Sequence, residues 1–175
     1  DGASQPPGGM VGRAPAMREL FRAMQKVAPA DTTVLIQGET GTGKELVARS
    51  IHEHSPRTQG PFVAVNCAAL PETLLEAELF GYKKGAFSGA DRDRKGIWEA
   101  ARDGTLFLDE VGELPKTLQK SFRRVLQEHR FRPLGSNREV SSDFRLIAAT
   151  NRNLDAMVEE GSFRSDLLFR LRAFI

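Results

Sequence analysis

The chain has little cysteine, few aromatic residues and almost no excess charge of either sign. Its one cysteine is Cys67, so no disulfide can form within the chain, which excludes the secreted proteins that depend on disulfides. Lys and Arg number 25 and Asp and Glu number 23, and the formal net charge of +2 gives no general affinity for nucleic acid or membranes. Any basic surface must therefore be local.

The chain also lacks long apolar runs and clusters of metal ligands. No stretch of about 18 apolar residues is present, and the N-terminal sequence DGASQPPGG has neither the basic nor the apolar region of a signal peptide. His52 and His54 would face different sides of a helix, which disfavours a zinc site. We therefore expect a soluble, cytoplasmic protein with no membrane partner.

The 175 residues, 40% of them hydrophobic, are suited to one compact domain. Residues 1–9 are rich in Pro, Gly and small polar residues, so we expect a disordered tail or the remnant of a linker there. The domain is expected over residues 10–175. Residues 172–175 are expected to begin a fifth strand. Because the given sequence stops within this strand, we expect the chain to be a piece of a longer protein.

Apolar periodicity predicts helices and strands that alternate along the chain. The predicted strands are 32–36, 62–65, 105–108 and 144–149, and the predicted helices are 15–29, one from about 44, 71–79, 97–101, 115–128, 154–160 and 163–171. In the helix from about residue 44, we expect Leu46, Val47 and Ile51 on the inner face. This alternation is typical of an α/β fold, and we predict a parallel sheet of about five strands flanked by helices.

A phosphate-binding motif directly follows the first predicted strand. It consists of Gly38, Glu39, Thr40, Gly41, Thr42, Gly43, Lys44 and Glu45. Glycines let backbone N–H groups turn toward a phosphate, the next helix adds the positive end of its dipole, and Lys44 supplies a mobile ammonium. Glu45 departs from the pattern, because Ser or Thr is expected there to hold Mg²⁺. The alternative is a Gly-rich turn with an incidental lysine.

Polar residues end the next strands, where a parallel sheet would bring them near the phosphate loop. Asp109 is expected to hold Mg²⁺ through water, and Glu110 to polarise the attacking water. Asn66 could hold the Glu110 carboxylate, and Thr150 with Asn151 could face the γ-phosphate. Solvated acids and ordinary turn residues are the alternatives.

Two arginines, Arg164 and Arg170, lie in the last predicted helix. They would stabilise transition-state charge if aimed at a γ-phosphate held by a neighbouring subunit. Because six residues correspond to about 240° on an ideal helix, the two share a face only if the helix breaks. Spacing alone favours a pair of surface cations.

A loop of small residues carries one large ring, that of Phe87. Its neighbours are Gly85, Ala86, Ser88, Gly89 and Ala90. Such a ring is either packed into the core or presented to a partner as an anchor. The residues alone leave both alternatives open.

Together these motifs resemble the central AAA+ ATPase domain of sigma-54-dependent transcriptional activators, the NtrC-like bacterial enhancer-binding proteins. The resemblance covers nearly all of residues 10–175, in the order GETGTGKE, FVAVNCAAL, ELFGYKKGAFSGA, GTLFLDEVGEL, RFRPLGS, LIAATNRNL and FRSDLLFRL. It implies a P-loop NTPase fold of AAA+ type that stops before the helical lid. GETGTGKE is the form that this family's phosphate loop takes, so Glu45 no longer counts against ATP.

The resemblance also implies roles for the candidate residues. Residues 38–45 would bind ATP, Asp109 would organise Mg²⁺, and Glu110 would be the catalytic carboxylate with Asn66 as its switching partner. Thr150 and Asn151 resemble the family's first sensor. The two candidate arginines of the last helix resemble the fingers offered to the adjacent protomer, so the active site would be shared between subunits of a ring, expected to be a hexamer.

The loop around Phe87 resembles the family's GAFTGA loop, which touches sigma-54. Residues 85–90 would make that contact, with Phe87 at the tip, and the segment near 130–140 resembles a second loop that moves with it. Ser88 replaces the usual threonine. The hydroxyl survives and a methyl is lost, so polar contacts could persist while packing against the partner weakens.

The resemblance therefore implies an ATPase ring that remodels sigma-54 RNA polymerase from a closed to an open promoter complex. DNA contacts are expected only through a helix-turn-helix domain outside this chain. The alternative is a nucleotide-regulated oligomerisation module of a transcription factor that does not remodel sigma-54, which the Ser88 departure keeps open. A small-molecule kinase would share the phosphate loop but would leave the Phe87 loop unexplained.

Overall fold

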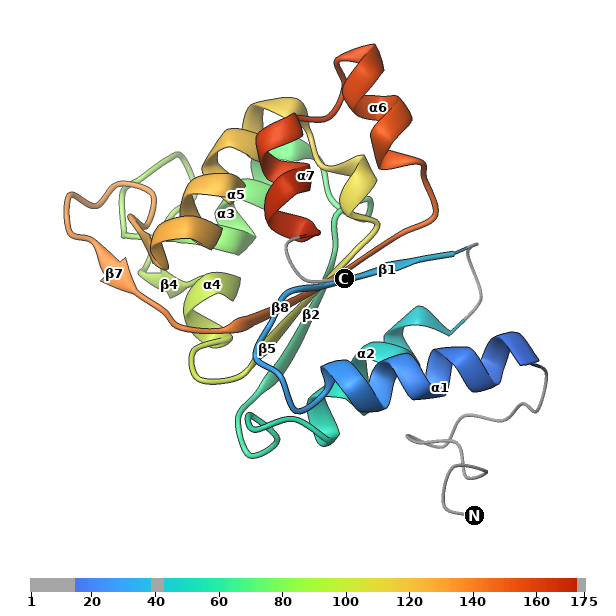
Figure 1. Ribbon diagram of the computed structural model, residues 1–175. Helices are drawn as coiled ribbons and strands as arrows, with labels where there is room; N and C mark the ends of the chain where they lie inside the picture. The colour runs from blue at the N-terminus through green and yellow to red at the C-terminus, as the bar shows by residue number, and fades with distance from the viewer. Residues whose placement is uncertain (1–14, 39–42, 173–175) are drawn as a thin grey trace.

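Four parallel strands form the central sheet of the computed structural model, which describes residues 15–38 and 43–172 (Figure 1). In spatial order they are β1 (Val34–Gln37), β8 (Arg145–Thr150), β5 (Thr105–Asp109) and β2 (Phe62–Asn66). All four strands predicted within the described residues are found. The predicted tail at 1–9 and residues 173–175 of the predicted fifth strand lie outside the described residues.

The central strands β5 and β8 are continuous runs of buried residues. Every residue of β8 is buried, as are the first four of β5, because helices cover both faces of the sheet. Side chains alternate between the faces: Phe107 and Ile147 join one apolar core, and Leu106 and Leu146 join the other. Because both faces are covered, apolar residues stand at successive positions in these strands.

Two helices, α1 (Pro15–Val27) and α2 (Lys44–Glu53), cover one face of the sheet (Figure 1). The other face is covered by α3 (Glu72–Phe80), α5 (Lys116–Glu128) and α7 (Ser165–Leu171), with the short helices α4 (Ile97–Ala100) and α6 (Leu154–Glu160) beside them. Val47 and Ile51 of α2 are buried as predicted. Leu46 is not: its side chain is 50% exposed, because it lies at the solvent side of the first turn.

A buried arginine joins the C-terminal end of α1 to the sheet. Arg145 begins β8 and is 2% exposed. Its guanidinium donates hydrogen bonds to the carbonyl oxygens of Val27 (2.6 Å), Ala28 (3.0 Å) and Thr32 (2.9 Å). These contacts satisfy carbonyls that the end of a helix and the following loop leave without partners.

Two small antiparallel hairpins were not predicted. One pairs β3 (Gly81–Tyr82) with β4 (Arg94–Lys95), and the other pairs β6 (Arg130–Phe131) with β7 (Val140–Ser141). They are joined through Leu134, whose N–H donates to the Gly81 carbonyl at 2.9 Å and whose carbonyl accepts from the Lys83 N–H at 3.0 Å. Because both strands of each hairpin are two residues long, they have no period-2 pattern from which to predict them.

None of the helices in the described part of the chain has the length and apolar character that a membrane span requires.

Candidate active site

The phosphate motif lies where β1 ends and α2 begins. Gly38 follows β1, and its N–H donates to the Thr150 carbonyl at 3.1 Å, which ties the start of the loop to β8. Gly43 precedes α2 with φ +77°, a left-handed conformation that glycine adopts without steric cost. Glu39, Thr40, Gly41 and Thr42 lie outside the described residues. Glu45 is exposed on the first turn of α2 and pairs with Arg49 at 3.1 Å.

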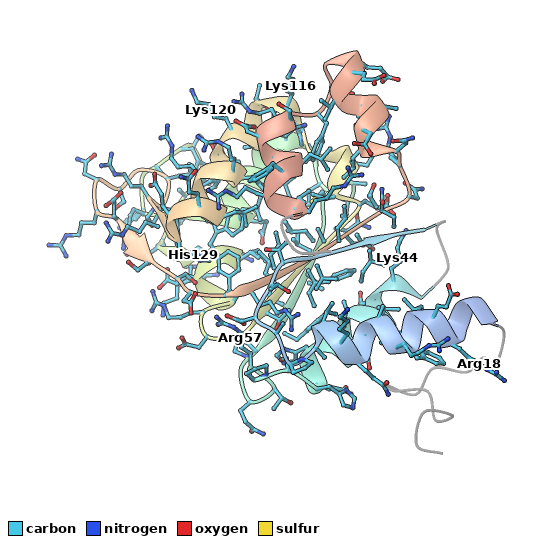
Figure 2. All side chains as sticks on the ribbon, viewed as in Figure 1. Arg18, Lys44, Arg57, Lys116, Lys120 and His129 are labelled. Atoms are coloured by element: carbon cyan, nitrogen blue, oxygen red, sulfur yellow. The ribbon has the colours of Figure 1, made fainter. Side chains whose placement is uncertain are left out.

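Lys44, the first residue of α2, reaches toward the carboxyl end of β1 (Figure 2). The side chain is 7% exposed, and Nζ donates a hydrogen bond to the Gly38 carbonyl at 2.9 Å. Nζ also lies 3.7 Å from Oε1 of Glu110. The structure thus brings together a cation and a carboxylate that lie far apart in the sequence.

Glu110 stands in a strained backbone conformation. Its φ of 54° and ψ of 49° are left-handed, which costs an L-residue other than glycine about 1–2 kcal/mol. The preceding residue, Asp109, ends β5, and its Oδ1 accepts a hydrogen bond from the Glu110 N–H at 2.9 Å. Backbone strain of this kind is concentrated at functional sites. It turns the Glu110 side chain, 16% exposed, toward Lys44.

Asn66 and Asp109 are neighbours across the sheet, because β2 and β5 pair in parallel with these two residues in register. The Asn66 side chain is nevertheless engaged in a turn: Oδ1 accepts from the Ala68 N–H at 2.8 Å. Among the contacts of the described residues there is no hydrogen bond between Asn66 and Glu110. The structure places Asn66 beside the acidic pair without joining it to the glutamate.

A buried cysteine also lies beside the two acids. The Cys67 N–H donates to the Asp109 carbonyl at 2.9 Å, and the residue is 2% exposed. Burial, together with the negative charges of Asp109 and Glu110, raises the pKa of the Cys67 thiol to about 12. The thiol therefore stays protonated near neutral pH and cannot act as a nucleophile.

Thr150 and Asn151 lie at the carboxyl end of β8, next to the phosphate loop. Thr150 is completely buried, and its Oγ1 accepts from the Arg152 N–H at 3.0 Å, so the hydroxyl orders the turn that presents Asn151. Gly112 packs closely on this hydroxyl, since a Cβ there would lie 3.0 Å from Oγ1. Asn151 itself is exposed at the edge of the sheet.

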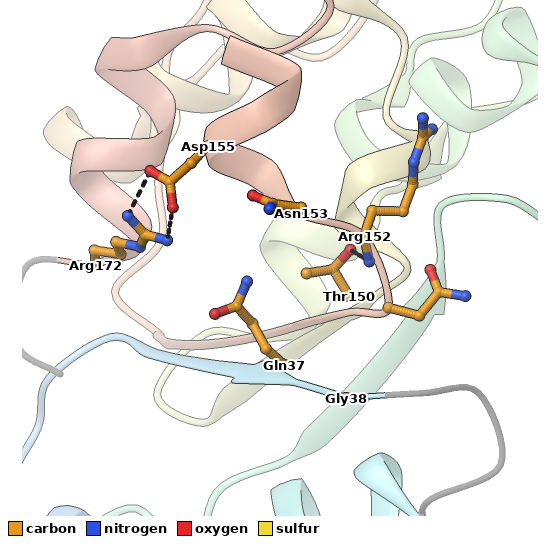
Figure 3. Close-up of a pocket in the computed structure, with 8 residues that line it drawn as sticks. Gln37, Gly38, Thr150, Arg152, Asn153, Asp155 and Arg172 are labelled. Carbon is orange, nitrogen blue, oxygen red and sulfur yellow. Dashed lines mark hydrogen bonds and ion pairs between the residues drawn. The ribbon is translucent and has the colours of Figure 1, made fainter. Parts of the chain in front are cut away.

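A hollow of about 520 Å³ opens beside these two residues (Figure 3). Gln37 at the end of β1 and Gly38 directly after it line the hollow, together with Asn153, which caps α6, and Asp155 in its first turn. Arg172 closes its far side by donating two hydrogen bonds to Asp155, at 2.8 and 2.6 Å, which hold the pKa of that carboxyl below its usual range. The hollow has room and polar groups for part of a nucleotide.

The two candidate arginines lie apart. Arg164 is not helical: it precedes α7 with φ −77° and ψ 133°, so the helical angle between the two does not apply. It lines a hollow with Lys116 of α5, whereas Arg170 lines a different one with His129 and Arg145. Neither arginine has a hydrogen bond or ion pair with the phosphate-loop lysine or the acidic pair in the described part of the chain.

The Phe87 ring is half-exposed and packs edge-on against Tyr82, with 4.8 Å between ring centroids and 66° between planes. It is therefore not part of the core. Ser88 beside it is exposed. Gly135 of the second loop approaches Ala86 so closely that a Cβ at Gly135 would lie 2.7 Å from that of Ala86. The loop that carries Phe87 and the loop that follows β6 thus form one surface unit.

Three residues at these sites were not predicted. Tyr82 seats the Phe87 ring, Gln119 binds the backbone of Arg164, and Asp166 binds its side chain. Only Asp166 had a sequence signal, as an acid two residues from a candidate arginine. The other two contacts join segments that no local pattern relates.

Comparison with known proteins places this geometry in context. A family model described as the Sigma-54 interaction domain matches residues 10–175. The regulatory protein AtoC of Escherichia coli (strain K12) is 54% identical over 164 residues, which are 94% of this chain and 36% of AtoC. The chain thus spans about a third of the length of this relative.

Solved structures show the same fold. NtrX from Brucella abortus in complex with ADP gives a TM-score of 0.86 at 41% identity, over 93% of this chain and 36% of NtrX. The P-loop NTPase domain of the sigma-54 transport activator from E. coli gives 0.62 at 21% identity, over 93% of this chain and 94% of that domain. The predicted α/β fold of the P-loop NTPase class is confirmed.

Proposed function

Because the chain belongs to the sigma-54 interaction domain family, we propose that it binds ATP and Mg²⁺, hydrolyses ATP in a ring of subunits and thereby remodels sigma-54 RNA polymerase for promoter opening. The observation that carries this proposal is the convergence of Lys44, Asp109 and Glu110 at one edge of the sheet. The proposed partner places the protein in the cytoplasm. Residues 10–175 would be the ATPase domain.

ATP binding would exchange the partners of Lys44. Its ammonium now contacts the Gly38 carbonyl at 2.9 Å and lies 3.7 Å from the Glu110 carboxylate. A phosphate in the loop would attract the ammonium more strongly than a single carboxylate, because it carries more charge and accepts several hydrogen bonds. Binding would therefore release Glu110. The relative NtrX, solved with ADP, supports a nucleotide at this site.

Asp109 would hold Mg²⁺ together with the phosphates. One carboxylate with phosphate oxygens and water is the donor set that Mg²⁺ commonly takes, and Asp109 presents its carboxylate at the carboxyl end of β5. The residues present fit the ion, although Glu45 supplies no hydroxyl. When bound, the ion would neutralise phosphate charge.

Glu110, released from Lys44, would accept a proton from the attacking water. Asn66 lies one strand away, beside Asp109, from where its amide could hold Glu110 after leaving the Ala68 turn. Thr150 and Asn151 would sense the γ-phosphate. Arg164 and Arg170 would serve the nucleotide of the neighbouring subunit, since neither contacts the site of its own subunit among the described residues. Ring assembly, proposed to be hexameric, would complete the site.

The loop of residues 85–90 would contact sigma-54 through the half-exposed Phe87 ring. Hydrolysis would change the position of this loop, as loss of a γ-phosphate does in other nucleotide switches. The exposed Ser88 keeps a hydroxyl at the tip. No observation on the described residues favours an oligomerisation module that does not remodel sigma-54.

The catalytic part of this proposal is tested with the variant Glu110→Gln, made in the full-length protein that contains these residues. We expect ATP binding to persist and turnover to fall by about 10²–10⁴-fold, the usual contribution of a general base. Glu128→Gln, an exposed acid on α5, is the control. Unchanged turnover would remove Glu110 from its proposed role.

The partner is tested by trapping. ADP with aluminium fluoride mimics the phosphoryl group in transfer and should stabilise a complex with sigma-54 that Phe87→Ala abolishes. If ATPase activity rises with protein concentration and no complex forms, the protein is a ring ATPase with a different partner.

A further inference from the structure

Arg164 has a fixed backbone and a side chain that can move. Its N–H donates to Oε1 of Gln119 at 2.8 Å, and Nε2 of Gln119 donates to the carbonyls of Leu114 and Ser162, both at 3.0 Å. Gln119 is completely buried, so its amide pins the start of α7 to α5. The Arg164 side chain, by contrast, is 35% exposed.

Two arginines share the carboxylate of Asp166. Arg164 donates from Nε to Oδ1 at 3.0 Å and from Nη2 to Oδ2 at 2.9 Å. Arg123 of α5 places its own Nε 3.2 Å from the same Oδ2. This Nε is buried and makes no hydrogen bond with Asp166, so the contact is an ion pair, and Nη1 of Arg123 donates a 2.7 Å hydrogen bond to the Gln127 side chain at the surface. Arg123 thus stands beside Asp166 as a second cation from α5, whereas Arg164 must break two hydrogen bonds before its side chain can leave.

The surroundings leave room for such a movement. Arg164 and Asp166 line an open hollow of about 310 Å³, bounded by Lys116 of α5, Val158 of α6 and Ser165 of α7. The guanidinium can turn into this space without displacing the backbone that Gln119 holds.

We propose that Arg123 is a positioning residue that lets Arg164 leave Asp166, by keeping the Asp166 carboxylate neutralised while Arg164 reaches toward a neighbouring subunit. This inference rests on the proposed function, in which Arg164 serves the nucleotide of that subunit. The Asp166 carboxylate is 41% exposed, so it keeps part of its hydration, and losing its only cation would cost a modest amount of free energy. With Arg123 in place, Asp166 keeps a partner throughout.

The attachment of Arg164 to Asp166 is measured first, by a double-mutant cycle on unfolding. The cycle of Arg164→Gln and Asp166→Asn is run once with Arg123 and once with Arg123→Gln. If Arg123 and Arg164 share the Asp166 carboxylate, removing Arg123 should strengthen the coupling between Arg164 and Asp166. Expressed as an equilibrium constant, this coupling should rise about two- to five-fold. An unchanged coupling overturns the proposal, whatever the ATPase activity.

Turnover is measured next, in the longest protein that carries this chain, at concentrations that saturate assembly. Arg123→Gln should lower kcat about two- to five-fold with an unchanged KM for ATP, because Arg164 then leaves Asp166 less readily. Arg123→Lys keeps the charge and should stay near the wild-type rate. Arg124→Gln, the exposed neighbour on α5, is the matched control.

The double variant Arg123→Gln with Asp166→Asn separates this role from a structural one. It should restore kcat, since no carboxylate remains to retain Arg164. If it stays slow, the loss comes from damaged packing between α5 and α7 and the proposal is wrong. A wild-type protein without ATPase activity would refute the proposed function and the role of Arg123 in turnover, whereas the coupling cycle would still decide whether Asp166 is shared.

Discussion

Replacing Arg145 by Met should detach the C-terminal end of α1 from the sheet. The guanidinium donates to the carbonyls of Val27, Ala28 and Thr32 from a position that is 2% exposed. The Val27 carbonyl also accepts from the Ala30 N–H at 3.1 Å and keeps that partner. The carbonyls of Ala28 and Thr32 lose the partner that the structure gives them.

The cost follows from these two acceptors. The bond to the Ala28 carbonyl is buried and the bond to the Thr32 carbonyl is partly buried. Because a buried acceptor without a partner costs about 1–3 kcal/mol, the two together cost up to about 6 kcal/mol. Burial of the guanidinium disfavours its charge and lowers the pKa of Arg145, and Met avoids that penalty. We therefore expect a net loss of about 2–4 kcal/mol in the free energy of unfolding, or roughly 4–16 °C in Tm for a chain of this size.

Urea and thermal unfolding measure this loss, and two further variants interpret it. Arg145→Lys keeps the charge but offers one ammonium, which cannot reach three carbonyls, so most of the loss should remain. Arg124→Met, at an exposed position on α5, should stay within about 0.5 kcal/mol of wild type. If Arg145→Met is no less stable than this control, α1 is held by the apolar contacts that its own residues Phe21 and Met24 make with the core, and the assigned role of Arg145 is wrong.

Three other predictions follow from individual side chains. Burial lowers the pKa of His52, whose ring lies 2.7 Å from the Thr105 hydroxyl, below 6.5. The contribution of the neutral ring to the free energy of unfolding should therefore be complete above about pH 6.5 and decrease as the pH drops further. Urea titrations at about pH 7.5 and 5.5 should show this decrease in the wild type and not in His52→Gln. Gly135→Val should push Ala86 away and weaken the trapped sigma-54 complex while ATPase activity persists; an intact complex would contradict the loop contact. Iodoacetamide should modify Cys67 at the rate of unfolding, and rapid labelling of the native protein would refute its burial.

Local patterns in the sequence were enough for most of the fold and for the chemistry of the candidate site. The runs at 105–108 and 144–149 are apolar apart from Thr105 and Arg145, as is typical of strands buried on both faces, and they form the central strands of the sheet. The phosphate motif and the acidic pair could be recognised because the residues of each are consecutive in the sequence. Because strands and helices alternate along the chain, a parallel sheet was predicted, and such a sheet places Asn66, Asp109 and Thr150 together at the carboxyl ends of its strands.

Tertiary structure alone decided how the candidate residues are held. The left-handed Glu110 beside Lys44, the Tyr82 seat of Phe87 and the exposure of Leu46 depend on contacts that apolar periodicity does not encode. Arg164 shows the difference most clearly. Its sequence position suggested a surface cation on a helix, but the helix begins one residue later, and the Asp166 carboxylate is shared with an arginine from α5. Ion pairs between distant segments form only when packing fixes the distance between two helices, so no spacing along the chain can predict them.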